Sequence, residues 1–393
     1  MSRLFDDELK MPPRVLLSEI QTTEIIGKGE FGVIFALDGV NLDSRNTKID
    51  RREENARQKL SRSCVRDANT REYPYVVKRY SPKANLYMER KNIRLKVLAI
   101  EAAVLSMVNH PNIIKLRAIA DVENVLDADF FFVMDRLSCT LSDKIYVEWK
   151  KRLKKACRFK AAIFRKKNQL LEELMVDRLF VARDIASAMV YLHSRNVIYR
   201  DMKPENTGFG MDGVVKLFDF GQARDVDPDS AIEDGTYALT GVCGSRRYMA
   251  PENLLRRPYG LDVDVYSFGI MLWEMMTLKK AFLGMDGEKH RTEVAIGGVR
   301  PDIPESLPSK VKSLLNECWS QDHRKRPSFS NVLLCLSGEL QSDKYSNVTR
   351  EKIDKSNAQT TRMNSTSSSS GVSINDGGIN SSGSSSLDTF SSM

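Results

Sequence analysis

The sequence lacks long apolar runs, paired cysteines and clustered histidines. Among its 393 residues, no apolar stretch approaches the roughly 18 residues that a membrane-spanning helix needs, and the first residues, MSRLFDDELKMPP, lack the apolar core of a signal peptide. The six cysteines are scattered, and the four histidines show no zinc-ligand spacing. These absences argue against membrane-spanning, disulfide-stabilised and zinc-binding proteins. They predict an intracellular, cytoplasmic location with reduced cysteines.

Positive charge is concentrated in one segment. The formal net charge is +8, yet the window 144–168 holds 11 Lys or Arg against a single acid, so this window alone carries +10. Trp149, Leu153 and Ala156 recur there at helical spacing, which predicts a basic amphipathic helix. Such a helix suits an acidic protein, an anionic membrane surface or a calmodulin-like groove; the alternative is a solvated helix without a partner. No base-reading pattern predicts specific nucleic-acid binding.

The composition divides the chain into an ordered part and a polar tail. Hydrophobic residues make up 41% of the sequence, enough for a sizeable core. Near residue 339 the composition shifts, and from Asn357 on the chain is mainly Ser, Asn, Gly and Thr. Such a segment buries too little apolar surface to offset chain entropy. We therefore expect an N-terminal extension over 1–19, an ordered unit of two lobes over 20–338, and a disordered tail over 339–393.

The most informative stretch runs from Val197 to Gly221, VIYRDMKPENTGFGMDGVVKLFDFG. It contains Asp201, with Lys203 two positions later and Asn206 five positions later, and then Asp219 in an Asp-Phe-Gly sequence. Two acids, a Lys and an Asn near one hairpin can hold a metal–phosphate group and accept a proton. Phosphoryl transfer needs such a set, because the protein must mainly position the reactants and neutralise charge on the transferring oxygens.

This stretch resembles the catalytic loop and the metal-binding loop of the eukaryotic protein kinases. The resemblance implies a two-lobed α+β fold, with a small β-rich lobe carrying one helix, a larger mainly helical lobe, and ATP between them. It also implies that Asp201 orients and deprotonates the acceptor hydroxyl and that Lys203 neutralises the transferring phosphoryl group. Asn206 and Asp219 would hold Mg²⁺.

A glycine-rich turn lies within a predicted hairpin over 20–39. Glycines let the backbone approach phosphates closely, although on this pattern alone a purely structural hairpin remains the alternative. A dinucleotide-binding loop would require a helix directly after the last Gly, whereas a β-rich run follows here. The resemblance to kinases implies an ATP-binding role for Ile26, Gly27, Lys28, Gly29, Glu30, Phe31, Gly32, Val33 and Ile34.

Further kinase-like positions follow in the expected order. Lys78 ends the strand Tyr75-Val76-Val77-Lys78 and matches the lysine that grips the nucleotide phosphates. Glu101, on a predicted helix, matches the glutamate that pairs with this lysine, whereas the competing Glu89 falls too early. Kinases usually have a shorter connection before this strand, so we interpret about 41–72 as an insertion, and 144–168 as a second one.

The strand Phe130–Leu137 resembles the last strand of the small lobe and the hinge that follows it. The resemblance implies that Met134 guards the back of the nucleotide pocket. It also implies that the backbone from Asp135 to Leu137 bonds adenine, and a plain core strand is compatible with both roles.

Two positions depart from the kinase pattern. Tyr199 replaces the usual His before Arg200-Asp201, and we expect it to preserve packing under Phe220. Gly208 stands where a larger apolar residue normally forms the floor under adenine, so nucleotide binding could be weakened or reshaped. A pseudokinase scaffold, acting through its basic insert and tail, is the alternative function. It predicts loss of a catalytic Lys or Asp, and none of these is missing.

The segment between Gly221 and Ala250 is similar to a kinase activation segment. Arg200 needs an anion to offset its charge, which favours Thr240 as a regulatory phosphorylation site, while Ser245 resembles the residue that bonds Asp201 and Lys203. A polar loop residue with no regulatory role is the alternative for Thr240.

The C-terminal motifs extend the same resemblance. Glu252 of Ala-Pro-Glu is expected to pair with Arg326, and Asp264 is expected to anchor the catalytic-loop backbone. Lys203 and the run KPEN are typical of Ser/Thr kinases. YMAPENLL and VYSFGIMLWEM favour the tyrosine-kinase-like branch of these enzymes.

Overall fold

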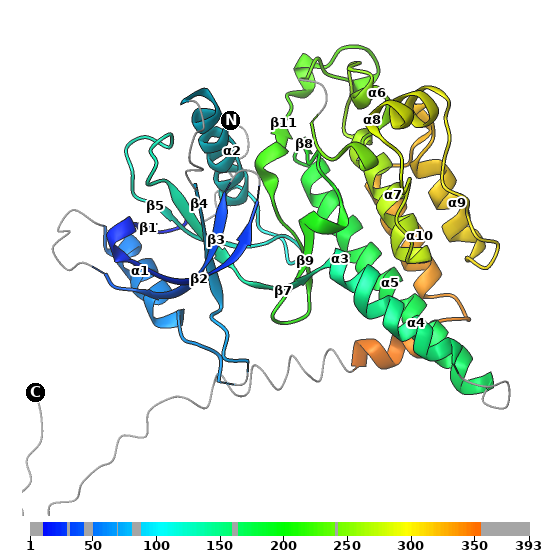
Figure 1. The fold of residues 1–393 in the computed structure, drawn as a ribbon, viewed down its shortest axis with the longest axis horizontal. Coiled ribbons are helices and arrows are strands. Elements are labelled where there is room, and N and C mark those ends of the chain that lie inside the picture. Colours follow the sequence, from blue (N-terminus) through cyan, green and yellow to red (C-terminus); the bar gives the residue numbers. More distant parts are fainter. Residues whose placement is uncertain are drawn as a thin grey trace, which may run out of the picture. The chain divides into compact units, whose positions relative to one another are not determined.

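A computed structural model describes residues 11–29, 32–42, 50–68, 70–80, 88–158, 164–239 and 243–354 of the chain. The chain divides into two units, residues 1–346 and 347–393. Of the second unit only 347–354 are described, and they are helical. The disordered tail predicted from residue 339 on is wrong for 339–354: a helix continues to Leu340, and Tyr345 is buried because its ring packs into the fold. The rest of the predicted tail lies outside the described residues. Unit 1 contains a β-rich small lobe and a mainly helical large lobe, as predicted (Figure 1).

The small lobe is built on a six-stranded sheet with the order β1-β5-β6-β4-β3-β2. Its strands are β1 (Arg14–Val15), β2 (Ile20–Lys28), β3 (Val33–Val40), β4 (Tyr75–Arg79), β5 (Leu116–Ala120) and β6 (Phe131–Asp135). All neighbours are antiparallel except β1, which runs parallel to β5. In the central strand β6, Phe131, Phe132 and Val133 are fully buried, as expected where both faces of a strand are covered.

Helix α2 (Met88–Ser106) covers one face of this sheet (Figure 1). Leu95, Leu98 and Ala102 are fully buried, at the three- and four-residue spacing that places side chains on one side of a helix. The same spacing carries Glu101 toward the interior, where only 1% of its surface is exposed.

The predicted small-lobe insertion contains helix α1 (Arg51–Ser63), which lies against β1 and β3. Glu53 and Glu54 stand in its first turn and Arg62 in its last, which complements the helix dipole. Arg57 forms an ion pair with Glu19, and both side chains are 2% exposed. The insertion is therefore tied into the small lobe by a buried charge pair.

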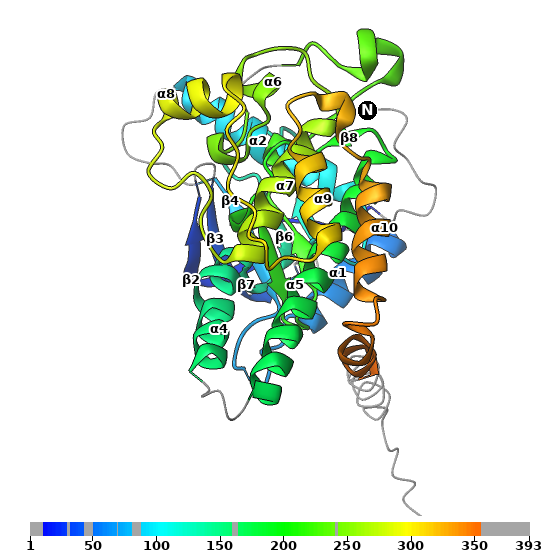
Figure 2. The same ribbon diagram turned by 90° about the vertical axis from the view of Figure 1, so that its right-hand side faces the viewer.

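The large lobe is organised around helix α7 (Asp262–Thr277). This helix is apolar on nearly all sides, and such a helix must be surrounded by other elements. Helices α5 (Phe164–His193) and α9 (Ser309–Cys318) contact it, and α10 (Phe329–Leu340) packs on both of these (Figure 2). The short helices α6 (Pro251–Leu254) and α8 (Gly287–Lys289) complete the lobe.

Two small sheets flank the segment that carries the predicted catalytic residues. One has the order β10-β9-β7, formed by Val215–Leu217, Thr207–Gly210 and Leu137–Thr140. In the other, β8 (Val197–Ile198) pairs with β11 (Arg224–Asp225). Strand β8 of the second sheet leads into the loop that carries Asp201 and β9 of the first sheet leads out of it, so the two sheets together set the position of the predicted catalytic residues.

The predicted basic insert forms part of a helical hairpin. The chain is helical from α3 (Leu141–Asp143) through a π-helical turn, Lys144–Trp149, into α4 (Lys150–Cys157), and α5 runs back beside α4. Ile145, Trp149 and Ala156 are buried, so the apolar stripe predicted from the sequence faces the protein. Among the described helices, none has an apolar stretch of sufficient length to span a membrane.

Candidate active site

A cavity of about 740 Å³ is lined by both lobes. The small lobe contributes residues of β2, β3, β4 and β6, and the large lobe contributes the catalytic loop and the start of the activation segment. The predicted site residues that line this cavity are Ile26, Gly27, Lys28, Gly29, Gly32, Ile34, Lys78, Met134, Asp135, Leu137, Asp201, Lys203, Asn206, Asp219 and Ser245.

Some predicted residues do not line the cavity. Val33, predicted with the glycine loop, is buried beside Ile34, and successive side chains of a strand point to opposite faces, so only Ile34 reaches the cavity. Glu101 lies behind Lys78. Glu30, Phe31 and Thr240 fall outside the described residues.

The cavity also has walls that the sequence interpretation missed. Val76 could have been found, because it lies two positions before Lys78 on β4 and therefore shares its face. The remaining residues gave no comparable signal: Ile114, Ser138, Cys139, Thr140, Asp143, Glu205, Phe218, Gln222 and Gly244.

Lys78 is held between two carboxylates. Its Nζ lies 2.6 Å from Glu101 Oε2 on α2 and 3.1 Å from Asp219 Oδ1. The predicted pairing with Glu101 is therefore confirmed. Burial alone lowers the pKa of Lys78, but the charges of Glu101 and Asp219 outweigh it and leave this pKa raised. Lys78 is thus held as a cation at a fixed place in the cavity wall.

Asp219 reaches this place through an uncommon backbone conformation. Its φ is +62°, in the left-handed region that few non-glycine residues adopt and that Asp tolerates better than most. The conformation turns the chain from β10 into the short turn Phe220–Gln222. A side chain at Gly221 would place a Cβ 2.5 Å from Val97 Cγ1 of α2, so this turn packs tightly against the helix that carries Glu101.

Asp201 is surrounded by hydrogen-bond donors. Its Oδ2 accepts from Lys203 Nζ at 2.6 Å and from Asn206 Nδ2 at 2.7 Å, and its Oδ1 accepts from the backbone N–H of Ser245 at 2.9 Å. Lys203 also donates to Ser245 Oγ at 2.8 Å, so the contacts predicted for Ser245 are confirmed. These bonds hold the carboxylate in one orientation at the cavity wall.

The loop that carries Asp201 is anchored to helix α7 by Asp264. The buried Asp264 accepts from the backbone N–H groups of Tyr199 and Arg200, each at 2.8 Å, which confirms the predicted anchor. His193 Nε2 lies 3.0 Å from the same carboxylate. A buried carboxylate is costly unless it is satisfied in this way, so Asp264 fixes the loop backbone to α7.

Tyr199 fills the position where kinases usually have His. Its ring contacts the Phe220 ring edge-on, with centroids 5.0 Å apart, as expected for a residue that preserves packing. Its hydroxyl donates to the carbonyl of Phe218 and lies 3.2 Å from that of Asn206. Burial raises the pKa of Tyr199 well above its ordinary value, so the hydroxyl remains a donor. The tyrosine thus links the two loops that carry Asp201 and Asp219.

The space beside Gly208 is already filled. The sequence predicted that the lack of a larger side chain here could weaken or reshape nucleotide binding. A Cβ at this position would lie 2.7 Å from Leu137 Cδ1 and 3.1 Å from the carbonyl oxygen of Cys139, closer than a Cβ normally approaches. Gly208 does not line the cavity, whereas Leu137 does. Leu137 of the hinge therefore occupies the space that the missing side chain leaves.

Asn206 and Asp219 provide oxygen atoms that suit Mg²⁺. The amide nitrogen of Asn206 is committed to Asp201, and its amide oxygen accepts no hydrogen bond from the described residues. Asp219 bonds Lys78 through Oδ1 only, and its side chain is 29% exposed. Carboxylate and amide oxygens are the ligands that hard divalent cations prefer, so the residues present fit the metal. No cluster of three or more His, Cys, Asp or Glu in the described part forms a complete protein-only metal site.

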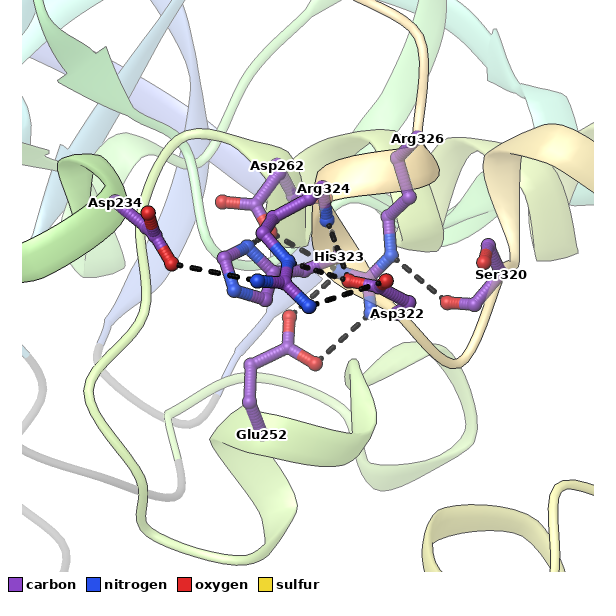
Figure 3. A network of polar contacts seen from close by, with 8 residues as sticks. All are labelled: Asp234, Glu252, Asp262, Ser320, Asp322, His323, Arg324 and Arg326. Atoms are coloured by element: carbon purple, nitrogen blue, oxygen red, sulfur yellow. Dashed lines mark hydrogen bonds and ion pairs between the residues drawn. The ribbon is translucent and has the colours of Figure 1, made fainter.

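The activation segment is fixed to the large lobe in its middle and at its C-terminal end. Gly244, with φ +96°, lies so close to the catalytic loop that a Cβ would come within 2.4 Å of the Arg200 carbonyl oxygen. Glu252 and Arg326 form the predicted two-bond ion pair, at 2.6 and 2.9 Å (Figure 3). Nearby, Arg324 lies 3.8 Å from Asp234 of the activation segment.

Comparison with known proteins agrees with this geometry. The family model for the protein kinase domain matches residues 61–335. The chain is 36% identical over 207 residues to serine/threonine/tyrosine-protein kinase HT1 of Arabidopsis thaliana, covering 50% of this chain and 51% of HT1. It is 38% identical over 153 residues to serine/threonine-protein kinase STY46 of Arabidopsis thaliana, covering 39% of this chain and 25% of STY46.

A third relative is the dual specificity protein kinase shkB of Dictyostelium discoideum, 36% identical over 156 residues, with 39% of this chain and 23% of shkB covered. The chain thus spans about half the length of HT1 and about a quarter of the other two. Because the family model matches well over half of the chain and the cavity brings the corresponding residues together, this chain belongs to the protein kinase family.

Proposed function

We propose that this protein is an ATP-dependent serine/threonine kinase that transfers the γ-phosphoryl group of Mg·ATP to hydroxyl groups of protein substrates. One observation carries the proposal. The cavity that holds the Lys78–Glu101–Asp219 cluster also exposes the Asp201 carboxylate, which Lys203, Asn206 and Ser245 hold in place. Phosphoryl transfer depends on such positioning and charge neutralisation more than on covalent chemistry by the protein.

In the proposed reaction, the acceptor oxygen forms a bond to the γ-phosphorus as the bond from this phosphorus to the β,γ-bridging oxygen breaks. Asp201 orients the acceptor hydroxyl and receives its proton, and ADP leaves with the bridging oxygen. Lys203, within reach of both Asp201 and Ser245, neutralises charge on the transferring group. Lys78 grips the α- and β-phosphates from its fixed position beside Glu101.

Asn206 and Asp219 are proposed to hold Mg²⁺ through their oxygen atoms. When bound, the cation neutralises phosphate charge. The hinge from Asp135 to Leu137 is proposed to bond adenine, since all three residues line the cavity. The glycine turn over Gly27, Gly29 and Gly32 is proposed to cover the phosphates.

Serine/threonine specificity is supported by Lys203 and by the names of the relatives. Lys203 stands two positions after Asp201, where tyrosine kinases usually have Ala-Ala-Arg. STY46 is named a serine/threonine kinase, HT1 a serine/threonine/tyrosine kinase and shkB a dual specificity kinase. The pseudokinase alternative is not favoured, because Lys78, Asp201 and Asp219 are all present and face one cavity. A cytoplasmic location stays a prediction, in keeping with six free cysteines.

Activation by phosphorylation of the segment 222–250 is a further part of the proposal. Arg200 is 6% exposed, and its guanidinium bonds the carbonyl of Gln222 and lies 3.2 Å from the Tyr259 hydroxyl, with no carboxylate partner among the described residues. A buried guanidinium paired only with neutral groups supports a nearby anion. Thr240 is the proposed carrier of that anion. Arg200→Ala and Thr240→Ala should both lower activity, and the double variant should lose little more than either alone.

The test of the proposed function is phosphate transfer by purified full-length protein. Radiolabelled Mg·ATP and a generic basic protein serve as substrates, and acid hydrolysis of the product separates phosphoserine, phosphothreonine and phosphotyrosine. We expect label on serine and threonine with the wild type and almost none with Asp201→Asn. Wild-type protein that binds ATP but transfers no label would favour the scaffold alternative.

A further inference from the structure

The helical hairpin carries a row of exposed cations beside the active site. We define the basic ridge as Lys150, Lys151, Lys154, Lys155 and Arg158, all of which are exposed. At 3.6 residues per turn, these five positions fall within an arc of about 140° around the helix. They therefore form one continuous face instead of a ring of scattered charges.

The ridge side chains contribute no ion pair or hydrogen bond to the described part of the fold. Two neighbouring cations do have partners, since Lys144 pairs with Glu148 at 2.5 Å and Arg152 pairs with Asp177. None of the five ridge side chains has a hydrogen bond or ion pair to another described residue. Like charges at this spacing repel one another, so the row weakens the helix unless something else requires it.

The opposite face of the same helix is already occupied. Ile145 is fully buried, Trp149 is 3% exposed and Ala156 is 1% exposed, because this face packs on the large lobe. The helix therefore has no apolar face left to enter a bilayer, and lasting attachment to a membrane takes a second signal besides basic residues. Apart from Val147, which is 65% exposed one turn before the ridge, the free face offers mainly charge, which suits an acidic protein segment.

The helical run that carries the ridge begins at the mouth of the active-site cavity, and Lys150 follows Asp143 by about two helical turns. Thr140 and Asp143, at the start of this helical run, line the cavity, and Lys144 lies over the Phe209 ring at 5.2 Å. One turn before the ridge, the Tyr146 ring lies 5.6 Å from Lys280 Nζ. A substrate chain that leaves Asp201 on this side therefore meets the ridge next.

The acidic charge at the cavity mouth is partly offset. Glu205 lines the cavity, but Lys280 lies 3.4 Å from its carboxylate and offsets the charge that would attract a basic substrate. Arg246, directly after Ser245, is exposed and has no ion pair among the described residues. The Glu205 carboxylate is thus offset by Lys280, and the exposed Asp143 at the start of the helical run remains an acidic group between the cavity and the ridge.

We propose that the basic ridge docks an acidic segment of the protein substrate while the acceptor hydroxyl lies at Asp201. The inference rests on the proposed kinase function and adds the chemical class of the substrate. From Lys150 to Arg158 the ridge is about 12 Å long, which matches about four residues of extended chain. Each contact between exposed charges contributes little binding free energy, but several contacts add up. Salt screens all of them.

The test compares two charge variants of the full-length protein. The ridge variant carries Lys150→Gln, Lys151→Gln, Lys154→Gln and Lys155→Gln. The control variant carries Arg51→Gln, Arg52→Gln, Lys59→Gln and Arg62→Gln on α1, which removes the same number of exposed cations from the small lobe. Each protein is titrated, without ATP, into a fluorescent peptide with a run of Asp and Glu. A Ser/Thr-rich peptide of equal length serves as the neutral probe.

We expect the ridge variant to bind the acidic peptide about tenfold more weakly than the wild type or the control variant, because several small charge contacts are lost together. Raising the salt concentration should remove the difference. Equal affinity of all three proteins for the acidic peptide would overturn the inference. This measurement needs no phosphoryl transfer, so it stands even if the proposed kinase function fails.

The second measurement uses the reaction. One acceptor peptide is prepared with an acidic tail and with a neutral tail, joined by a flexible linker on either side of the acceptor. The ridge variant should raise KM for the acidic substrate alone and leave kcat unchanged. An equal loss on both substrates would overturn the inference, since it indicates a structural defect. Ridge-dependent binding to vesicles rich in anionic lipid, without preference for the acidic tail, would also overturn it in favour of a membrane surface.

Discussion

The cations of the active-site cavity and those of the basic ridge differ in exposure and in pairing. Lys78 is 7% exposed and held by two carboxylates, and Lys203 is paired with Asp201. The ridge lysines are exposed and have no partner among the described residues. A buried cation needs a fixed partner to offset the cost of leaving water, and the partner then fixes its position. An exposed cation keeps its hydration and stays available to an anion in solution.

Removing groups from the cavity should have the largest effect. Asp201→Asn removes the proton acceptor and Lys78→Met removes the phosphate contact, so each should lower kcat/KM by about 10² or more while the protein stays folded. Steady-state kinetics measure the loss, and thermal unfolding checks the fold. Near wild-type turnover in either variant would mean that the site is assigned wrongly. Lys154→Gln is the matched control, with little expected change on a small neutral peptide.

The comparison extends to stability through Arg57. Its ion pair with Glu19 is 2% exposed at both ends, so Arg57→Ala leaves the buried Glu19 carboxylate without this cation. Breaking such a pair typically costs about 3–5 kcal/mol of unfolding free energy. Lys154→Ala, at an exposed position, should change it by no more than about 0.5 kcal/mol. Denaturant unfolding of both variants measures the difference, and similar values would refute the distinction between the two kinds of cation.

A larger side chain at Gly208 should clash with the residues that form the cavity wall. Gly208→Leu forces atoms into Leu137 and the Cys139 carbonyl, and overpacking of this kind typically costs about 1–3 kcal/mol, so ATP affinity should fall on the order of tenfold. Nucleotide titration measures the change. Adding Leu137→Ala to Gly208→Leu should restore part of the ATP affinity, because removal of the Leu137 side chain makes room for the new leucine. Tighter ATP binding by the single variant would show that the space is free after all.

His290 is a third case, because burial favours its uncharged form in the folded state. His290 is 4% exposed, and burial lowers its pKa below the ordinary 6.5, with the charges of Arg247 and Arg300 acting in the same direction. A depressed pKa in the folded state gives stability that is present above pH 6.5 and is lost as the pH falls below it. His290→Phe should therefore lose less unfolding free energy than the wild type between pH 7 and pH 5. Parallel pH profiles of the two proteins would contradict this.

The smallest expected effect is that of the ridge variant on substrates too short to reach the ridge. The four-lysine ridge variant should turn over a small neutral peptide at close to the wild-type rate, because none of the four residues lines the cavity. Deleting the whole of 144–168 is a poorer test of the same idea. The deletion also removes the buried Ile145 and Trp149, so lost activity would not separate a catalytic role from misfolding.

The sequence by itself determined the family and most of the chemistry. Asp201, Lys203 and Asn206 lie close together in the chain, so their spacing alone identifies them as one catalytic loop. Lys78, Glu101 and Asp219 are far apart in the chain, and their assignment came from the order of motifs and the resemblance to kinases. Their meeting at 2.6 and 3.1 Å could not be calculated from periodicity, because it requires the sheet, α2 and the turn after β10 to be folded together.

Tertiary structure alone decided what the departures and the insertions mean. Gly208 is compensated by Leu137, a residue on a strand that is distant in sequence and adjacent in the sheet. The basic window was equally compatible with a membrane-inserting and a protein-binding helix. Only the packing of Trp149 and Ala156 on the large lobe showed which face is left free. A local pattern specifies the faces of a helix, whereas burial depends on which neighbours the rest of the chain brings against them.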